Sequence, residues 1–123
     1  MTTLAFVALG SALGAPARYL LDGLIQSSRE RIFPWGTWTI NVTGCFALGL
    51  LVGVADHGGV DPRLLAAVGT GFLGAYTTFS TFTWETLRLV EDGSLLAALL
   101  NVALSTVLGL AAAAGGLALG TLW

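Results

Sequence analysis

Long, mostly apolar stretches without charge alternate along this chain with short clusters of charged residues. Residues 32–55, 64–84 and 93–123 contain no Asp, Glu, Lys or Arg, and the first charged side chain is Arg18. A membrane-spanning helix needs about 20 predominantly apolar residues. The pattern therefore predicts an all-α membrane protein with four transmembrane helices in one domain. The predicted spans are about residues 4–25, 36–55, 63–88 and 95–121 of a domain that covers 1–123.

Composition supports this interpretation and excludes several classes of partner. Only 10% of the 123 residues are charged, whereas about 25% is usual in a soluble domain. With a net charge of −2 and no basic cluster, we expect the lipid bilayer as a partner and no nucleic acid. Cys45 is the only cysteine, so we expect neither an intramolecular disulfide nor a metal site built on cysteines.

One stretch inside the third predicted span, residues 71–82, is unusually polar for a membrane helix. Its hydroxyl side chains are Thr77, Thr78, Ser80 and Thr81, and the rings of Phe79 and Phe82 lie three residues apart. Gly71 and Gly74 precede them, and glycine costs about 1 kcal/mol relative to alanine inside a helix. We therefore expect the third helix to be broken near its middle, close to Gly74. Lipid cannot satisfy freed backbone groups, so the break should face protein or a water-filled path.

Polar side chains on the other predicted spans each allow two interpretations. Asn41 either makes a hydrogen bond between helices, worth about 1 kcal/mol, or presents its amide N–H to an anion. Arg18 is either an anchor at the membrane interface or a cation at the mouth of an anion path. Asn101 and Ser105 share one face of the fourth span, where they either join helices or form a second wall of the path.

Patterns that would suggest an enzyme are weak here. Residues 69–74 match G-x-G-x-x-G, but a dinucleotide site needs this motif between a strand and a helix, and it lies here within a predicted membrane span. The deep hydroxyls of the third span have no histidine or carboxylate beside them to activate a nucleophile. We therefore do not expect catalysis.

Three motifs occur in order along the chain and carry a resemblance to a known family. They are Gly10-x-x-x-Gly14-x-x-x-Arg18-Tyr19, Gly36-Thr-x-x-x-Asn41-x-x-Gly44 and Gly71-x-x-Gly74-x-x-Thr-Thr-Phe-Ser-Thr-Phe82. In this arrangement the chain resembles the Fluc (CrcB) fluoride channel family. The resemblance implies a passive, fluoride-selective channel that exports cytoplasmic fluoride and protects against its toxicity. It further implies a multi-pass protein of the prokaryotic inner (plasma) membrane that forms an antiparallel, dual-topology dimer.

The resemblance also implies roles for individual residues. The resemblance implies that the fluoride pore is lined by Asn41, Phe79, Phe82, Thr78, Ser80 and Thr81, and by Ser105 and Asn101 on the fourth helix. It also implies that Arg18 lies in the vestibule. The backbone carbonyls of Gly74 and Thr77 resemble the family's structural Na⁺ site at the centre of the dimer. The chain departs from the family pattern at Asn101, where some members have tyrosine, at Gly109, where some have serine, and at Ala75, often a glycine.

Two alternatives stay open at this point. A small, dual-topology, proton-coupled multidrug exporter also has four short spans, but it needs a membrane carboxylate in its first helix, and this chain has none there before Asp22. The second alternative concerns the partner. Arg29, Arg31 and Arg88 lie on one predicted side of the membrane and Arg63 on the other, which is a modest bias in orientation. The partner is therefore either a second copy or an oppositely oriented paralogue.

Overall fold

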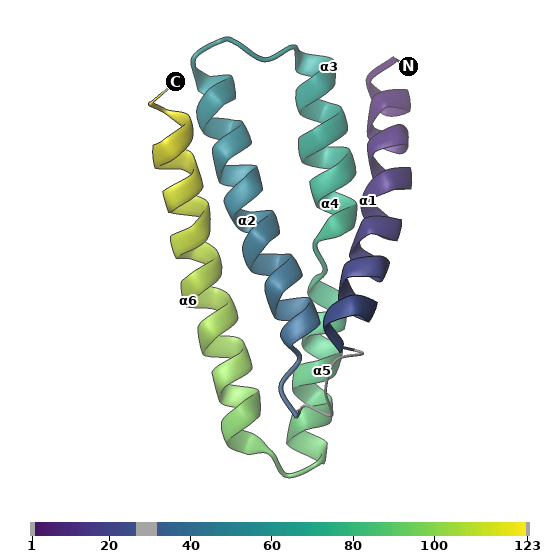
Figure 1. Ribbon diagram of the computed structural model, residues 1–123, viewed down its shortest axis with the longest axis vertical. Helices are drawn as coiled ribbons and strands as arrows, with labels where there is room; N and C mark the ends of the chain where they lie inside the picture. Colours follow the sequence, from purple (N-terminus) through teal and green to yellow (C-terminus); the bar gives the residue numbers. More distant parts are fainter. Residues whose placement is uncertain (1, 27–31, 123) are drawn as a thin grey trace.

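The computed structural model describes residues 2–26 and 32–122, and within these ranges every regular element is helical. The elements are α1 (Thr2–Gln26), α2 (Trp35–Asp56), α3 (Pro62–Leu65), the π-helical η1 (Ala66–Leu73), α4 (Gly74–Tyr76), α5 (Phe79–Glu91) and α6 (Leu95–Gly120). They form a bundle whose long segments run alternately up and down, with both chain ends at the same end of the bundle (Figure 1). The all-helical prediction is confirmed, while Arg29 and Arg31 lie outside the described residues.

Three helices are long and apolar enough to cross a membrane: α1, α2 and α6, with 25, 22 and 26 residues. At 1.5 Å per residue they are about 33 to 39 Å long, which exceeds the roughly 30 Å hydrocarbon core of a bilayer. The remaining long segment is divided into residues 62–76 and 79–91. Each half is only about 20 Å long, so the two must stack end to end to cover the same distance. The chain is therefore a multi-pass membrane protein.

The interruption of this segment lies at Thr77 and Thr78 rather than at Gly74. Gly74 has helical dihedral angles, φ −64° and ψ −33°. By contrast, Thr77 has ψ 157° and Thr78 has φ −147° and ψ 124°, so both are extended. The break predicted close to Gly74 is therefore present, three residues further along the chain. The low helix propensity of glycine is a weak effect, and the side-chain hydrogen bonds of the threonines outweigh it.

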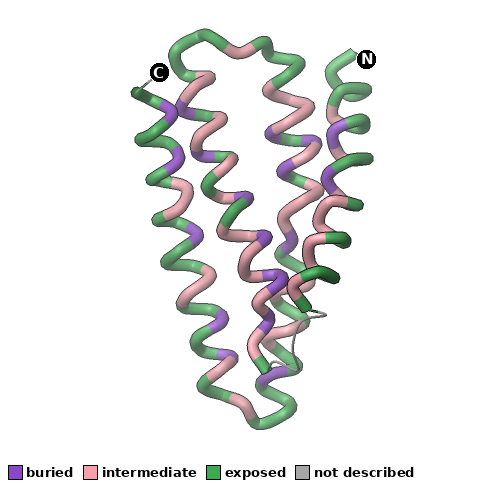
Figure 2. Tube along the Cα trace, viewed as in Figure 1, coloured by how far each residue is buried: buried purple, intermediate pink, exposed green. Residues whose placement is uncertain are grey.

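Glycines allow the helices to approach each other closely. A Cβ atom at Gly10 would overlap the backbone carbonyl of Ala67, and one at Gly49 would overlap that of Ala113. Gly10 thus sets the contact of α1 with η1, and Gly49 sets that of α2 with α6, as small residues do in membrane helix pairs. Figure 2 shows buried positions along the facing sides of the helices and exposed positions along their outer sides.

Candidate functional site

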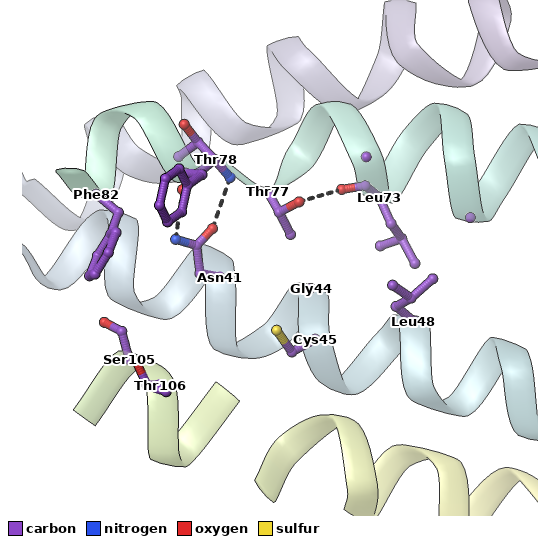
Figure 3. A pocket seen from close by; sticks show the side chains of 13 residues that line it. Asn41, Gly44, Cys45, Leu48, Leu73, Thr77, Thr78, Phe82, Ser105 and Thr106 are labelled. Atoms are coloured by element: carbon purple, nitrogen blue, oxygen red, sulfur yellow. Dashed lines mark hydrogen bonds between the residues drawn. The ribbon is translucent and has the colours of Figure 1, made fainter. Parts of the chain in front are cut away.

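Asn41 holds the interrupted segment in place from the neighbouring helix α2. Its Nδ2 donates to the backbone carbonyl of Thr78 at 2.9 Å, and the Thr78 N–H donates to Asn41 Oδ1, also at 2.9 Å (Figure 3). The amide thus satisfies both backbone groups of an extended residue, as a neighbouring strand would. The bond between helices that we considered for Asn41 is therefore present. Its second N–H has no partner among the described residues, so it remains available as a donor.

The break also releases two backbone carbonyls. In a continuous helix the Thr78 N–H would donate to the carbonyl of Gly74, and the Thr81 N–H to that of Thr77. Here the Thr78 N–H donates to Asn41, and the Thr81 N–H donates to Thr78 Oγ1 at 3.3 Å. Gly74 and Thr77 therefore both present carbonyl oxygens that have lost their helical donors. Oxygen ligands of this kind suit hard cations, so the donor set fits the Na⁺ expected here.

The hydroxyl groups differ in whether their protons are free. Thr77 Oγ1 donates to the Leu73 carbonyl at 3.0 Å, and Thr78 Oγ1 donates to Thr81 Oγ1 at the same distance. Thr81 accepts this bond, and its own proton has no acceptor among the described residues. Ser80 is exposed, with its Oγ 3.4 Å from Thr78 Oγ1. Thr81 is therefore the hydroxyl best placed to donate to an incoming anion.

Two cavities lie on either side of the break and share Thr78 as part of their walls. The larger has a volume of about 370 Å³. Its polar and aromatic wall consists of Asn41, Thr77, Thr78, Phe79, Phe82, Ser105 and Thr106, and the rest of its lining is glycine, leucine and Cys45 (Figure 3). The smaller cavity, about 190 Å³, is lined by Arg18, Tyr19, Asp22, Thr37, Ile40, Thr78 and Thr81. Thr78 is therefore the residue that the walls of both cavities have in common.

Arg18 gives the smaller cavity its positive charge. Arg18 and Asp22 both line this cavity, yet no ion pair joins them within the part of the chain that the structure describes. Asp22 Oδ1 is buried and has no hydrogen-bond partner there. The smaller cavity is therefore lined by one cation and one carboxylate that are not in direct contact.

Two phenyl rings form the aromatic part of the larger cavity. The centroids of Phe79 and Phe82 are 5.8 Å apart, with an angle of 41° between the ring planes. Phe79 is 78% exposed. The edge of a phenyl ring carries partial positive charge, so such rings can line an anion path without a formal charge.

The structure brings most of the predicted site residues together around the two cavities, but Ser80 and Asn101 line neither of them. Ser80 is exposed beside the break. Asn101 lines neither cavity, because it is only 1% exposed and lies between α5 and α6. There it donates to Thr86 Oγ1 at 2.9 Å and accepts from Ser105 Oγ at 3.4 Å. Sequence reasoning missed Thr86 and also Thr37. Thr86 follows Phe82 by four residues and Thr37 precedes Asn41 by four, so helical spacing was the available signal.

Comparison with known proteins shows similarity over almost the whole chain. Residues 5–117 match the family described as CrcB-like protein, Camphor Resistance (CrcB). The chain is 49% identical over 110 residues to fluoride-specific ion channel FluC 1 of Streptomyces avermitilis, with 89% of both chains covered. It is 48% identical over 118 residues to FluC 1 of Frankia casuarinae, with 92% of both covered. It is 47% identical over 124 residues to FluC of Solidesulfovibrio magneticus, which covers 97% of this chain and 96% of that one.

Proposed function

This chain belongs to the CrcB family, and from that membership we propose that it is a fluoride-selective channel through which the ion leaves the cell passively, limiting fluoride toxicity. The observation that carries the proposal is the break at Thr77 and Thr78, which Asn41 holds between two cavities. The chain that contains this break is similar over nearly its full length to proteins named fluoride-specific ion channels. A proton-coupled exporter is less favoured, because α1 contains no carboxylate before Asp22.

The proposed path leads from the smaller cavity past Thr78 to the larger one. Fluoride is attracted by Arg18 and receives a hydrogen bond from Thr81 while it loses water. Beyond Thr78 it meets the free N–H of Asn41 and the edges of the two phenyl rings. These neutral donors replace hydration without the strong attraction of a fixed charge, so the ion can also leave.

A second chain completes the proposed path. Gly74 and Ser80 are exposed at the middle of the interrupted segment, and the ring of Phe79 is 78% exposed. Hydrocarbon cannot satisfy the freed carbonyls or the serine hydroxyl, so protein must cover them. The family resemblance favours an antiparallel partner, either a second copy or an oppositely oriented paralogue, in the inner membrane of a prokaryote. Its freed carbonyls, together with those of Gly74 and Thr77, would surround the Na⁺.

We expect the purified chain to form a dimer whose stability depends on Na⁺. Four carbonyl oxygens turned toward one another repel, and a cation between them offsets that repulsion. Chemical cross-linking in detergent should yield a dimer in Na⁺ buffer and much less dimer in N-methylglucamine buffer at the same ionic strength. Monomer alone in both buffers would contradict the second copy, and equal amounts of dimer in both would contradict the Na⁺ site.

Fluoride efflux from vesicles tests the proposed function. Liposomes that contain the reconstituted chain and are loaded with fluoride should release it rapidly, whereas chloride release should stay at the level of protein-free vesicles. An ion-selective electrode follows both ions. If fluoride stays inside, or if chloride leaves equally fast, the proposal fails.

The same assay tests the roles of the two rings. Phe79→Ile and Phe82→Ile keep apolar bulk but remove the polar ring edge, so each should lower fluoride efflux. Efflux as fast as in the wild type for both variants would remove the rings from the proposed path.

A further inference from the structure

A chain of three hydrogen bonds runs from the wall of the larger cavity, through a deeply buried amide, to the backbone of α5. Ser105, which lines the cavity, donates from Oγ to Asn101 Oδ1 at 3.4 Å. Asn101 donates from Nδ2 to Thr86 Oγ1 at 2.9 Å, and Thr86 Oγ1 donates to the Phe82 carbonyl at 2.7 Å. All three bonds point in the same direction, from α6 toward the backbone of Phe82. We call these three residues, Ser105, Asn101 and Thr86, the α5–α6 relay.

The short bond at one end determines the direction of the others. Thr86 has a single hydroxyl proton, and the 2.7 Å bond to the Phe82 carbonyl uses it. Thr86 Oγ1 can then only accept, so the NH₂ group of Asn101 must face it. The Asn101 oxygen is consequently left facing Ser105. Because Asn101 is only 1% exposed, water cannot replace Thr86 or Ser105 as the partner of its amide.

The long bond at the other end leaves the proton of Ser105 easy to redirect. A separation of 3.4 Å is well beyond the usual 2.7–2.8 Å of an O–H···O bond, so the interaction is weak. An anion in the cavity is a stronger acceptor than a neutral amide oxygen. The Ser105 proton can thus turn to the ion as it arrives and return to Asn101 when it leaves. Without Asn101 Oδ1, a helical serine bonds the carbonyl four residues earlier and turns away from the cavity.

We propose that Asn101 is a positioning residue for anion passage, which keeps the Ser105 hydroxyl available to the ion without touching the ion itself. This inference rests on the proposed function, because it takes the anion in the larger cavity to be the transported fluoride. Thr86 is the second positioning residue, since it sets the orientation of the Asn101 amide. The role differs from lining the pore, which we expected of Asn101 from the family resemblance.

A double-mutant cycle on fluoride efflux tests the proposal. Asn101→Leu and Ser105→Ala should each slow efflux about three- to tenfold, the scale of one lost hydrogen bond. The double variant should be no slower than Ser105→Ala, because Asn101 acts through Ser105. If the two losses multiply instead, Asn101 has a separate role and the proposal is overturned.

A matched pair of threonines covers the case in which Asn101→Leu does not fold. Thr86 and Thr83 both lie on α5 and both donate to the carbonyl four residues earlier, but only Thr86 also accepts from Asn101. Thr86→Val should therefore slow efflux, and this loss should vanish in the Ser105→Ala background, whereas Thr83→Val should change little. Equal effects of the two threonine variants would overturn the relay.

The outcomes also separate this inference from the proposed function. Absence of fluoride efflux from the wild type would overturn both. Rapid wild-type efflux combined with multiplicative losses would overturn the inference alone. The thermal unfolding midpoint of each variant identifies a merely structural role. In that case the variant would lower both stability and efflux, whether position 105 holds serine or alanine.

Discussion

Replacing Asn41 with aspartate should reduce fluoride efflux at least about 100-fold. The carboxylate keeps an acceptor for the Thr78 N–H but has no donor for the Thr78 carbonyl, and it removes the free N–H that we assign to the ion. A fixed negative charge beside the path also repels an anion, by about 4 kcal/mol at 4 Å with an effective dielectric constant of 20. Because 1.4 kcal/mol corresponds to a tenfold change in rate, even part of this repulsion exceeds the effect of the lost hydrogen bonds.

Efflux from proteoliposomes with matched amounts of protein measures this loss. Thr43→Val is a suitable control, because Thr43 lies on the same helix, is exposed and lines neither cavity. Its efflux should stay within about twofold of the wild type, as is usual for an exposed substitution. Asn41→Asp with undiminished efflux, in protein that remains folded, would show that the ion does not pass Asn41.

The second large effect concerns folding, where we expect Gly10→Ala to destabilise the protein by about 2–3 kcal/mol. The added methyl group would overlap the Ala67 carbonyl oxygen and would lie 2.8 Å from the Phe72 backbone nitrogen. Both atoms belong to the backbone of η1, so no change of rotamer can relieve the contact. α1 must move away from η1, and this separation also disturbs the smaller cavity, to which α1 contributes Arg18.

Gly115→Ala is the matched control, because a Cβ added at Gly115 would meet no atom of another helix within 4 Å. Alanine is also favoured over glycine in a helix, so this variant should be at least as stable as the wild type. Thermal unfolding in detergent should show a drop of roughly 10 °C for Gly10→Ala and no drop for the control. Equal midpoints for the two variants would mean that α1 and η1 are not in close contact in the folded protein.

The sequence predicted the helices well but the centre of the site less well. The observed bounds of α1, α2 and α6 agree with the predicted ranges within two residues. The sequence predicted a break close to Gly74, because glycine is the weakest helix former nearby. Its actual position depends on Asn41, which lies 37 residues earlier and pairs with Thr78. No local sequence pattern predicts which residue of another helix will lie opposite Thr78.

Asn101 illustrates the same limit. Its spacing of four residues from Ser105 placed both on one helical face, and such a face can border either a cavity or another helix. The structure shows that Ser105 reaches the cavity while Asn101 meets Thr86 on α5. A difference of one helical turn along α6 therefore separates a cavity-lining residue from a buried one.

By itself, the sequence determined that this chain crosses a membrane several times, which family it belongs to, and which segment carries its unusual polar chemistry. These properties depend on which residues follow one another, because hydrophobicity and motif order are local. The tertiary structure alone decided at which residues the interrupted segment opens, which side chain of another helix pairs with it and which hydroxyl protons stay free. These properties depend on hydrogen bonds, whose short range and strict direction let a partner on another helix override the preference of the local sequence.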